Sequence, residues 1–206
     1  MDKKVSDLLR AYEERSKREW ALMDRLSEAD ARSDIDDFLL SVGPHTGEFL
    51  HMLVEDAKST RILEIGTSYG YSTTWLADAA RMTGGRVTTI ELQAKKRDHA
   101  RQQLEGVGLA GHVEFQLGDA LAILAKLDGP YDFVLLDLWK NLYVGCFDRF
   151  LPKLAPGALV VADNMIYPPD THAQTMAYQR RLRDTGRFES VLLPIGSGLE
   201  VSRLIA

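Results

Sequence analysis

Five short apolar runs, each followed by a segment of helical pattern, constrain the fold of this chain more than any other feature. The runs are RILEIG (61–66), RVTTIEL (86–92), VEFQLG (113–118), YDFVLLD (131–137) and ALVVADN (158–164). Segments with helical character lie between them, for example residues 71–82 and 94–107. Strands that alternate with helices pair in parallel, and the helices cover both faces of the sheet. The sequence therefore predicts an α/β fold with a doubly wound, mostly parallel sheet.

The last two apolar runs predict a hairpin. ESVLLPIG (189–196) and LEVSRLIA (199–206) are separated only by Ser197 and Gly198. Two residues are too few for a helical crossover, but they suffice for a tight turn between antiparallel strands. We therefore expect the sheet to finish with a C-terminal antiparallel strand.

Residues 1–30 carry apolar side chains at helical spacing among many charges. The apolar positions are Val5, Leu8, Leu9, Tyr12, Leu22, Met23 and Leu26. This pattern predicts one or two amphipathic N-terminal helices. Such helices either pack on the core or serve as a lid or a homodimer arm, and the sequence leaves these alternatives open.

Length and composition favour a single domain over residues 1–206. The chain is 45% hydrophobic, which is enough for one sizeable core. Its net charge is -5 and it has no long polybasic stretch, so we expect a small-molecule partner and no nucleic acid. The N-terminus lacks the apolar core of a signal peptide, and no stretch is long enough to span a bilayer. We therefore expect a soluble, cytoplasmic protein that does not contact membranes.

Any metal site in this chain must rely on oxygen ligands. Cys146 is the single cysteine, which excludes a disulfide scaffold and a cysteine zinc site. No ligand spacing is found among the five histidines, at positions 45, 51, 99, 112 and 172.

The carboxyl ends of the strands are where open α/β sheets bind ligands, and the first three ends favour a nucleoside. After the first run, Gly66 and Gly70 in GTSYGYS (66–72) allow a tight turn and close ligand approach, although the loop is not a G-x-G-x-x-G dinucleotide motif. Glu91 ends the second run, where it either accepts hydrogen bonds from ribose hydroxyls or is simply solvated. Asp119 follows the third run and either reaches an adenine edge or caps the next helix.

The fourth and fifth runs end in oxygen-bearing side chains. Asp137 ends one, and Asp163 with Asn164 ends the other. If the two strands are neighbours, the carboxylates repel each other unless a cation or a proton lies between them. Three hard oxygen ligands with further positions open describe a Mg²⁺ or Mn²⁺ site, beside which Lys140 could act as a base. The alternatives are aspartates that only cap helices or turns, and a lysine exposed on a turn.

From about Phe38 to the C-terminus, the sequence resembles the class I S-adenosylmethionine-dependent methyltransferases, specifically the Mg²⁺-dependent catechol O-methyltransferase type. The resemblance is carried by six motifs in order, SVGPHTG (41–47), LEIGTSYGYS (63–72), TIE (89–91), LDLWK (136–140), ADNMIYP (162–168) and GLE (198–200). It implies a Rossmann-like, seven-stranded sheet. It also implies transfer of a methyl group from S-adenosylmethionine to one hydroxyl of a Mg²⁺-chelated, catechol-type (ortho-diphenol) small molecule.

The resemblance further implies a role for each matching position. The cofactor would be bound by Val42, Gly66, Tyr71, Ser72, Glu91, Asp119, Ala120 and Asp137. The metal ion would be bound by Asp137, Asp163 and Asn164. The base would be Lys140, and the second substrate hydroxyl would be oriented by Glu200. The substrate-binding residues would be Phe38, Trp139, Lys140, Asn164, Pro168 and Glu200.

Two other functions fit part of the pattern. GTSYG is formally G-x-S-x-G, and Ser68, Asp163 and His172 follow triad order, so a serine esterase or hydrolase is one alternative. Against it, the residues before this loop look helical, whereas a hydrolase of that kind has several strands there. The second alternative is a non-catalytic S-adenosylmethionine-binding module, which would leave Lys140 and the oxygen ligands without a task.

Overall fold

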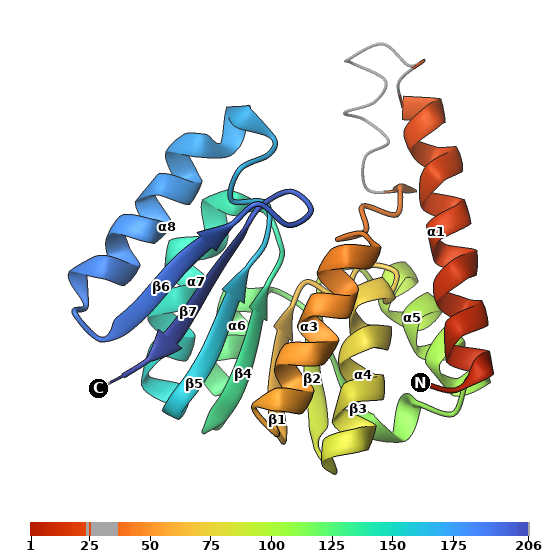
Figure 1. Ribbon diagram of the computed structural model, residues 1–206, viewed down its shortest axis with the longest axis horizontal. Coiled ribbons are helices and arrows are strands. Elements are labelled where there is room, and N and C mark those ends of the chain that lie inside the picture. Colours follow the sequence, from red (N-terminus) through yellow and green to blue (C-terminus); the bar gives the residue numbers. More distant parts are fainter. Residues whose placement is uncertain (24, 26–36, 206) are drawn as a thin grey trace.

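Seven strands form one sheet in the computed structural model, which describes residues 1–23, 25 and 37–205 (Figure 1). The strands are β1 (Arg61–Ile65), β2 (Arg86–Glu91), β3 (Val113–Leu117), β4 (Tyr131–Leu136), β5 (Leu154–Ala162), β6 (Phe188–Leu193) and β7 (Leu199–Leu204). β7 pairs antiparallel with β5 and β6, and the other pairs are parallel. The predicted mostly parallel, seven-stranded sheet with a C-terminal antiparallel strand is confirmed.

The strand order β3-β2-β1-β4-β5-β7-β6 changes direction between β1 and β4. β2 and β3 lie in order on one side of β1, and β4 and β5 lie in order on its other side. The carboxyl ends of β1 and β4 therefore border the crevice in which doubly wound sheets bind their ligands.

Helices cover both faces of the sheet, as predicted (Figure 1). One layer contains α1 (Lys3–Met23), α3 (Pro44–Asp56), α4 (Tyr71–Thr83) and α5 (Ala94–Gly106). The opposite layer contains α6 (Ala120–Lys126), α7 (Tyr143–Phe150) and α8 (His172–Asp184). Short 3₁₀ helices are η2 (Ala110–His112), η3 (Lys140–Leu142), η4 (Leu151–Lys153) and η5 (Pro169–Thr171). In the part of the chain that the structure describes, no helix is both long and apolar enough to cross a lipid bilayer.

The alternation of side chains along β4 explains the two layers. Phe133 and Leu135 join the core cluster on the α3 and α4 side, and Val134 and Leu136 join the cluster on the α7 and α8 side. All four side chains are fully buried, as expected for a central strand of a sheet covered on both faces. Burial of each contributes about 1.5–3 kcal/mol, so the end of this strand is held firmly in place.

Two strand boundaries differ from the sequence prediction by more than two residues. β5 begins at Leu154, because this residue pairs with Tyr131 of β4. An irregularity at Pro156 and Gly157 follows, and regular pairing resumes at Leu159. β6 ends at Leu193, so the hairpin connection spans residues 194–198 and is longer than the two residues expected. The irregularity and the turn depend on pairing with other strands, which local periodicity does not report.

The N-terminal region contains the predicted amphipathic helix. Val5, Leu9 and Tyr12 of α1 are buried in the core cluster on the α3 and α4 side, whereas Leu22 near its end is exposed. Leu26, also part of the predicted pattern, lies outside the described residues. The first half of α1 thus adopts the core-packing alternative, and its roles as a lid or a dimer arm stay predictions.

Candidate active site

Three strand ends meet where the strand order changes direction. The backbone N–H of Asp137 donates to the carbonyl of Ile65 (3.0 Å), and the N–H of Asp163 donates to the carbonyl of Leu136 (3.1 Å). The hydrogen-bond ladder therefore continues one residue past β1, β4 and β5. As a result, Gly66, Asp137 and Asp163, which come from three separate motifs, share one rim of the sheet.

The loop after β1 requires glycine at two positions. Gly66 has a φ of 109°, and a Cβ atom there would lie 1.8 Å from the carbonyl oxygen of Asp137. Gly70 has a φ of 95°, and a Cβ atom there would lie 2.7 Å from the Cβ of Ala100 on α5. Both glycines thus combine left-handed backbone with close packing, which lets α4 begin at the edge of the crevice.

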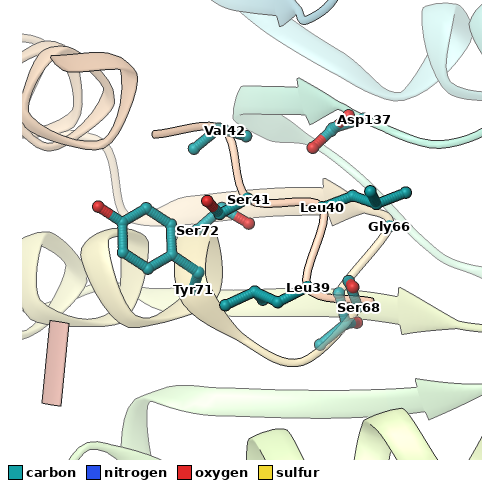
Figure 2. A pocket seen from close by; sticks show the side chains of 10 residues that line it. Leu39, Leu40, Ser41, Val42, Gly66, Ser68, Tyr71, Ser72 and Asp137 are labelled. Carbon is teal, nitrogen blue, oxygen red and sulfur yellow. The ribbon is translucent and has the colours of Figure 1, made fainter. Parts of the chain in front are cut away.

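A pocket lies between this loop and residues 39–42 (Figure 2). Its lining consists of Leu39, Leu40, Ser41, Val42, Gly66, Thr67, Ser68, Tyr71, Ser72 and Asp137. Figure 2 shows Asp137 and Gly66 at one end of the pocket and Tyr71 at the other. The structure therefore brings the predicted cofactor residues Val42, Gly66, Tyr71, Ser72 and Asp137 around one cavity.

α1 braces the loop from outside the pocket. The hydroxyl of Tyr12 donates to the carbonyl of Tyr69 (2.6 Å), and the hydroxyl of Tyr71 donates to Oε1 of Glu13 (3.0 Å). The guanidinium of Arg15 lies 4.1 Å from the centre of the Tyr69 ring. The N-terminal helix thus contributes directly to the conformation of the pocket wall.

The other predicted cofactor residues lie on neighbouring strand ends. Glu91 is 9% exposed, and its carboxylate accepts hydrogen bonds from the N–H groups of Ser68 and Gln93, each at 2.8 Å. Asp119 caps α6 by accepting the N–H of Ala122 at 2.8 Å, and Ala120 follows in the first turn. The helix-cap alternative for Asp119 is therefore confirmed, whereas the contacts of these residues with ribose and adenine stay predictions.

Glu64, which the sequence analysis missed, contacts the pocket wall through Ser72. It is fully buried in the middle of β1, and its carboxylate accepts hydrogen bonds from the hydroxyls of Ser72, Thr73 and Thr89, each at 2.6 Å. Burial raises the pKa of Glu64 to about 7, although the three hydrogen bonds act in the opposite direction. The available signal was a charged residue between the apolar residues Leu63 and Ile65 of β1.

Lys140 lies in the centre of the oxygen-rich cluster. Its Nζ donates to Oδ1 of Asn164 (2.7 Å), to the hydroxyl of Tyr143 (2.7 Å) and to the carbonyl of Leu138 (3.0 Å). It also lies 3.4 Å from Oδ1 of Asp137, and 11% of its side chain is exposed. The two strand ends and the lysine thus form one connected polar cluster, as their spacing predicted.

Asp163 is the buried carboxylate of this cluster. It is 2% exposed, and its Oδ1 is buried without a hydrogen-bond partner among the described residues. Burial, and after it the charge of Asp137, raises the pKa of Asp163, while the charge of Lys140 lowers it. A buried carboxylate oxygen without a partner needs a proton or a cation, so Asp137, Asp163 and Asn164 fit a divalent ion that prefers oxygen ligands. The described residues contain no group of three or more His, Cys, Asp or Glu side chains that could hold a metal, so this fit depends on two carboxylates and one amide.

The predicted substrate residues lie in different environments. Trp139 is 53% exposed on the segment after β4, and Pro168 is half-buried on the segment after β5, whereas Phe38 is buried. Exposed apolar neighbours on the segment after β5 are Ile166 and Tyr167. An apolar surface therefore follows the two strand ends that carry the polar cluster.

Glu200 belongs to another hydrogen-bond network. It is 3% exposed, and its carboxylate accepts hydrogen bonds from Nε2 of Gln179 on α8 (2.7 Å) and from the hydroxyl of Ser190 on β6. Glu200 pairs with Ala162 across β5 and β7, and Ala162 belongs to the core cluster on the α7 and α8 side. The orientation of a substrate hydroxyl by Glu200 stays a prediction.

The triad of the hydrolase alternative is not joined by hydrogen bonds in the described part of the chain. Nε2 of His172 contacts the carbonyl of Ile166 (2.7 Å), and the N–H of Ser68 donates to Glu91 (2.8 Å). Oδ1 of Asp163 has no hydrogen-bond partner among the residues that the structure describes. The arrangement therefore differs from the nucleophile, base and acid contacts that such an enzyme uses.

Comparison with known proteins identifies relatives of the chain. A family model described as O-methyltransferase matches residues 13–205. A catechol O-methyltransferase from Niastella koreensis is 37% identical over 131 residues, which cover 62% of this chain and 59% of that protein. This match thus spans less than two thirds of the length of that relative. Caffeoyl-CoA O-methyltransferase 1 from Nicotiana tabacum is 29% identical over 192 residues, covering 82% of this chain and 79% of that protein.

A solved structure has the same fold. The O-methyltransferase TomG from Streptomyces achromogenes, involved in tomaymycin synthesis and solved in complex with SAM, aligns with a TM-score of 0.76 and 28% identity. The alignment covers 100% of this chain and 91% of TomG.

Proposed function

The chain belongs to the O-methyltransferase family, and from this premise we propose that it transfers a methyl group from S-adenosylmethionine to one hydroxyl of an ortho-diphenol chelated by Mg²⁺ or Mn²⁺. The observation that carries the proposal is the cluster of Asp137, Asp163, Asn164 and Lys140 beside the pocket of the glycine loop. A non-catalytic binding module would not need this cluster.

The pocket supports the cofactor assignment. Val42, Gly66 and Ser72 line it, and the carboxylate of Glu91 lies next to the loop, 2.8 Å from the N–H of Ser68. The relative TomG was solved in complex with SAM. When bound, the cofactor supplies a sulfonium methyl group, so the task of these residues is to align the methyl group with the attacking oxygen.

The oxygen cluster supports the metal assignment. Asp137, Asp163 and Asn164 would hold the ion, which would supply positive charge that favours the ionised phenol. The buried Oδ1 of Asp163 has no hydrogen-bond partner among the described residues, and this observation supports the metal assignment most directly. The Lys140 ammonium stands in for part of that charge, since it contacts the oxygens of Asn164 and Asp137.

Lys140 is the proposed base. Its side chain is 11% exposed and its Nζ lies on the oxygen cluster. As the neutral amine, Lys140 would accept the proton of a substrate hydroxyl bound there and become the ammonium. Trp139 and Pro168, on the segments after β4 and β5, would contact the aromatic ring. Glu200 would orient the second hydroxyl of the substrate, the role that the resemblance implies for it.

A metal-dependent assay tests the proposal. We expect purified protein with S-adenosylmethionine and Mg²⁺ to methylate catechol on one hydroxyl, and phenol far more slowly because phenol cannot chelate the ion. Lys140→Met should lower turnover by about 10² to 10⁴, the usual range for a positioned proton acceptor. Chelator should abolish activity, and Mg²⁺ or Mn²⁺ should restore it. Full activity in excess EDTA, or equal rates with catechol and phenol, would contradict the proposal.

The same assay resolves the substrate class and the hydrolase alternative. Caffeoyl esters should be compared with free catechols, because both carry an ortho-diphenol and relatives of both names match this chain. Ser68→Ala serves as the control for esterase chemistry, since a hydrolase would need this hydroxyl as its nucleophile. We expect Ser68→Ala to keep methyl transfer.

A further inference from the structure

The hydroxyl of Tyr143 contacts three segments of the candidate active site. Tyr143 is the first residue of α7 and is fully buried. Its oxygen lies 3.0 Å from the carbonyl of Leu136 and 3.0 Å from the carbonyl of Asp163, and it accepts a hydrogen bond from Nζ of Lys140 at 2.7 Å. One atom therefore contacts the end of β4, the end of β5 and the proposed base.

These contacts bear directly on the metal ligands. Leu136 immediately precedes Asp137, and Asp163 immediately precedes Asn164. A hydroxyl that shares its proton between the carbonyls of Leu136 and Asp163 fixes the separation of the two strand ends. The Tyr143 ring packs against Tyr178 with centroids 5.7 Å apart, so the hydroxyl has little freedom to move.

Tyr143 also limits the freedom of Lys140. A lysine ammonium has three protons, and here they are directed to Tyr143, Asn164 and Leu138. Tyr143, which supplies one acceptor, is fully buried, whereas Asn164, which supplies another, is partly exposed at the rim of the sheet. Without the Tyr143 hydroxyl, the flexible lysine chain would lose its most rigid side-chain acceptor.

Tyr178 provides an internal comparison. It is also a fully buried tyrosine in the same core cluster, but its hydroxyl has no hydrogen-bond partner among the described residues. Ring burial alone therefore does not explain the three polar contacts of Tyr143.

We propose that Tyr143 is a positioning residue for methyl transfer, whose hydroxyl is held by the carbonyls at the ends of β4 and β5 and places the Lys140 amine. The inference rests on the proposed function, because it assigns Tyr143 an effect that acts through Lys140 as the base. It adds a residue that the spacing of the motifs did not identify.

Tyr143→Phe tests the proposal, with Tyr178→Phe as the matched control. Each change removes one hydroxyl from a fully buried ring. We expect Tyr143→Phe to lower kcat by about 10- to 100-fold, the usual effect of losing a hydrogen bond to a charged group, with unchanged affinity for S-adenosylmethionine. Tyr178→Phe should keep the wild-type kcat. Equal kcat values in Tyr143→Phe and the wild type would overturn the proposal.

A double-mutant cycle separates positioning of the base from general damage. If Tyr143 acts through Lys140, Tyr143→Phe should cost less than about two-fold in a Lys140→Met background, because the interaction is already gone. A full additional loss of 10- to 100-fold in that background would mean that the hydroxyl acts independently of Lys140, and it would overturn the proposal.

A readout without metal or turnover uses ¹⁵N NMR of the lysine ammonium groups. In the metal-free wild type, Lys140 should give a slowly exchanging Nζ signal that disappears in Lys140→Met. The signal should be lost or shifted in Tyr143→Phe and retained in Tyr178→Phe. An unchanged signal in Tyr143→Phe would overturn the inference.

The outcomes of the two proposals are distinguishable. A wild-type protein that methylates no ortho-diphenol would refute the proposed function, while the NMR comparison would still decide whether Tyr143 holds Lys140. If Tyr143→Phe folds poorly, saturating S-adenosylmethionine should restore the fold by mass action and permit all measurements. A variant that stays unfolded under those conditions would show that the hydroxyl serves the fold, which would overturn the proposal.

Discussion

Glu64→Gln should remove a decrease in the free energy of unfolding that the wild type shows as pH rises. Glu64 is fully buried in β1, and its carboxylate accepts hydrogen bonds from Ser72, Thr73 and Thr89. Glutamine has nearly the same shape, and the three hydroxyls can rotate to donate to its oxygen or accept from its amide. The substitution therefore removes a titrating group with little change in packing.

The size of the effect follows from the pKa of Glu64. Burial raises it from 4.5 to about 7, and the three hydrogen bonds and the charge of Asp137 have smaller effects. Between these two values the folded protein binds more protons than the unfolded chain, so its free energy of unfolding falls as pH rises. The contribution is fully present below pH 4.5 and is lost as pH rises through about 7. The difference between the two pKa values corresponds to about 3 kcal/mol.

Denaturant unfolding of both proteins at pH 5 and at pH 8.5 measures this effect. At pH 5 we expect similar stabilities, because most of Glu64 is protonated in the folded wild type and resembles glutamine. At pH 8.5 we expect Glu64→Gln to be more stable than the wild type by about 2.5 kcal/mol relative to the difference at pH 5, because a small part of the loss has already occurred at pH 5. Other titrating groups are common to both proteins, so their effects cancel. A constant stability difference across this pH range would show that the three hydroxyls keep Glu64 ionised.

Two further substitutions test the loop and the helix cap. Gly66→Ala should abolish binding of S-adenosylmethionine in calorimetry, because its Cβ would lie 1.8 Å from the carbonyl oxygen of Asp137. Gly84→Ala is the control and should keep binding, because Gly84 has a similarly left-handed backbone but a Cβ there would meet no atom within 4 Å. Equal affinities in the two variants would contradict the steric argument. Asp119→Ala should lower the free energy of unfolding by about 1 kcal/mol through loss of the α6 cap, and Asp119→Asn should retain it. If Asp119→Asn keeps stability but weakens cofactor binding, the carboxylate also contacts the cofactor.

Local sequence patterns predicted most of the arrangement of strands and helices. The alternation of apolar runs and helical segments predicts the parallel part of the sheet, because burial on both faces and a helical crossover each leave a local period. The spacing of Asp137 and Lys140, and of Asp163 and Asn164, likewise predicts which polar residues follow β4 and β5. These features lie within a few residues of one another, so one sequence suffices to recognise them.

The tertiary structure decided what depends on contacts between distant segments. Only the pairing of β1 with β4 and of β4 with β5 shows that Gly66, Asp137 and Asp163 share one rim. The local sequence around Tyr143 indicates only a buried helix residue. In the fold, its hydroxyl contacts the carbonyls of Leu136 and Asp163, which lie before and after it in the sequence.

The direction of a side chain from its strand is the second feature that required the fold. Glu64 and Glu200 both lie on strands beside large apolar residues, and a sequence pattern does not tell which hydrogen-bond partners each one has. In the fold, Glu64 accepts hydrogen bonds from three hydroxyls near the loop after β1, and Glu200 accepts them from Gln179 on α8 and Ser190 on β6. Sequence therefore determined which elements form and which polar residues end the strands, whereas packing determined their partners, because a buried polar group is stabilised only by the groups that the fold brings to it.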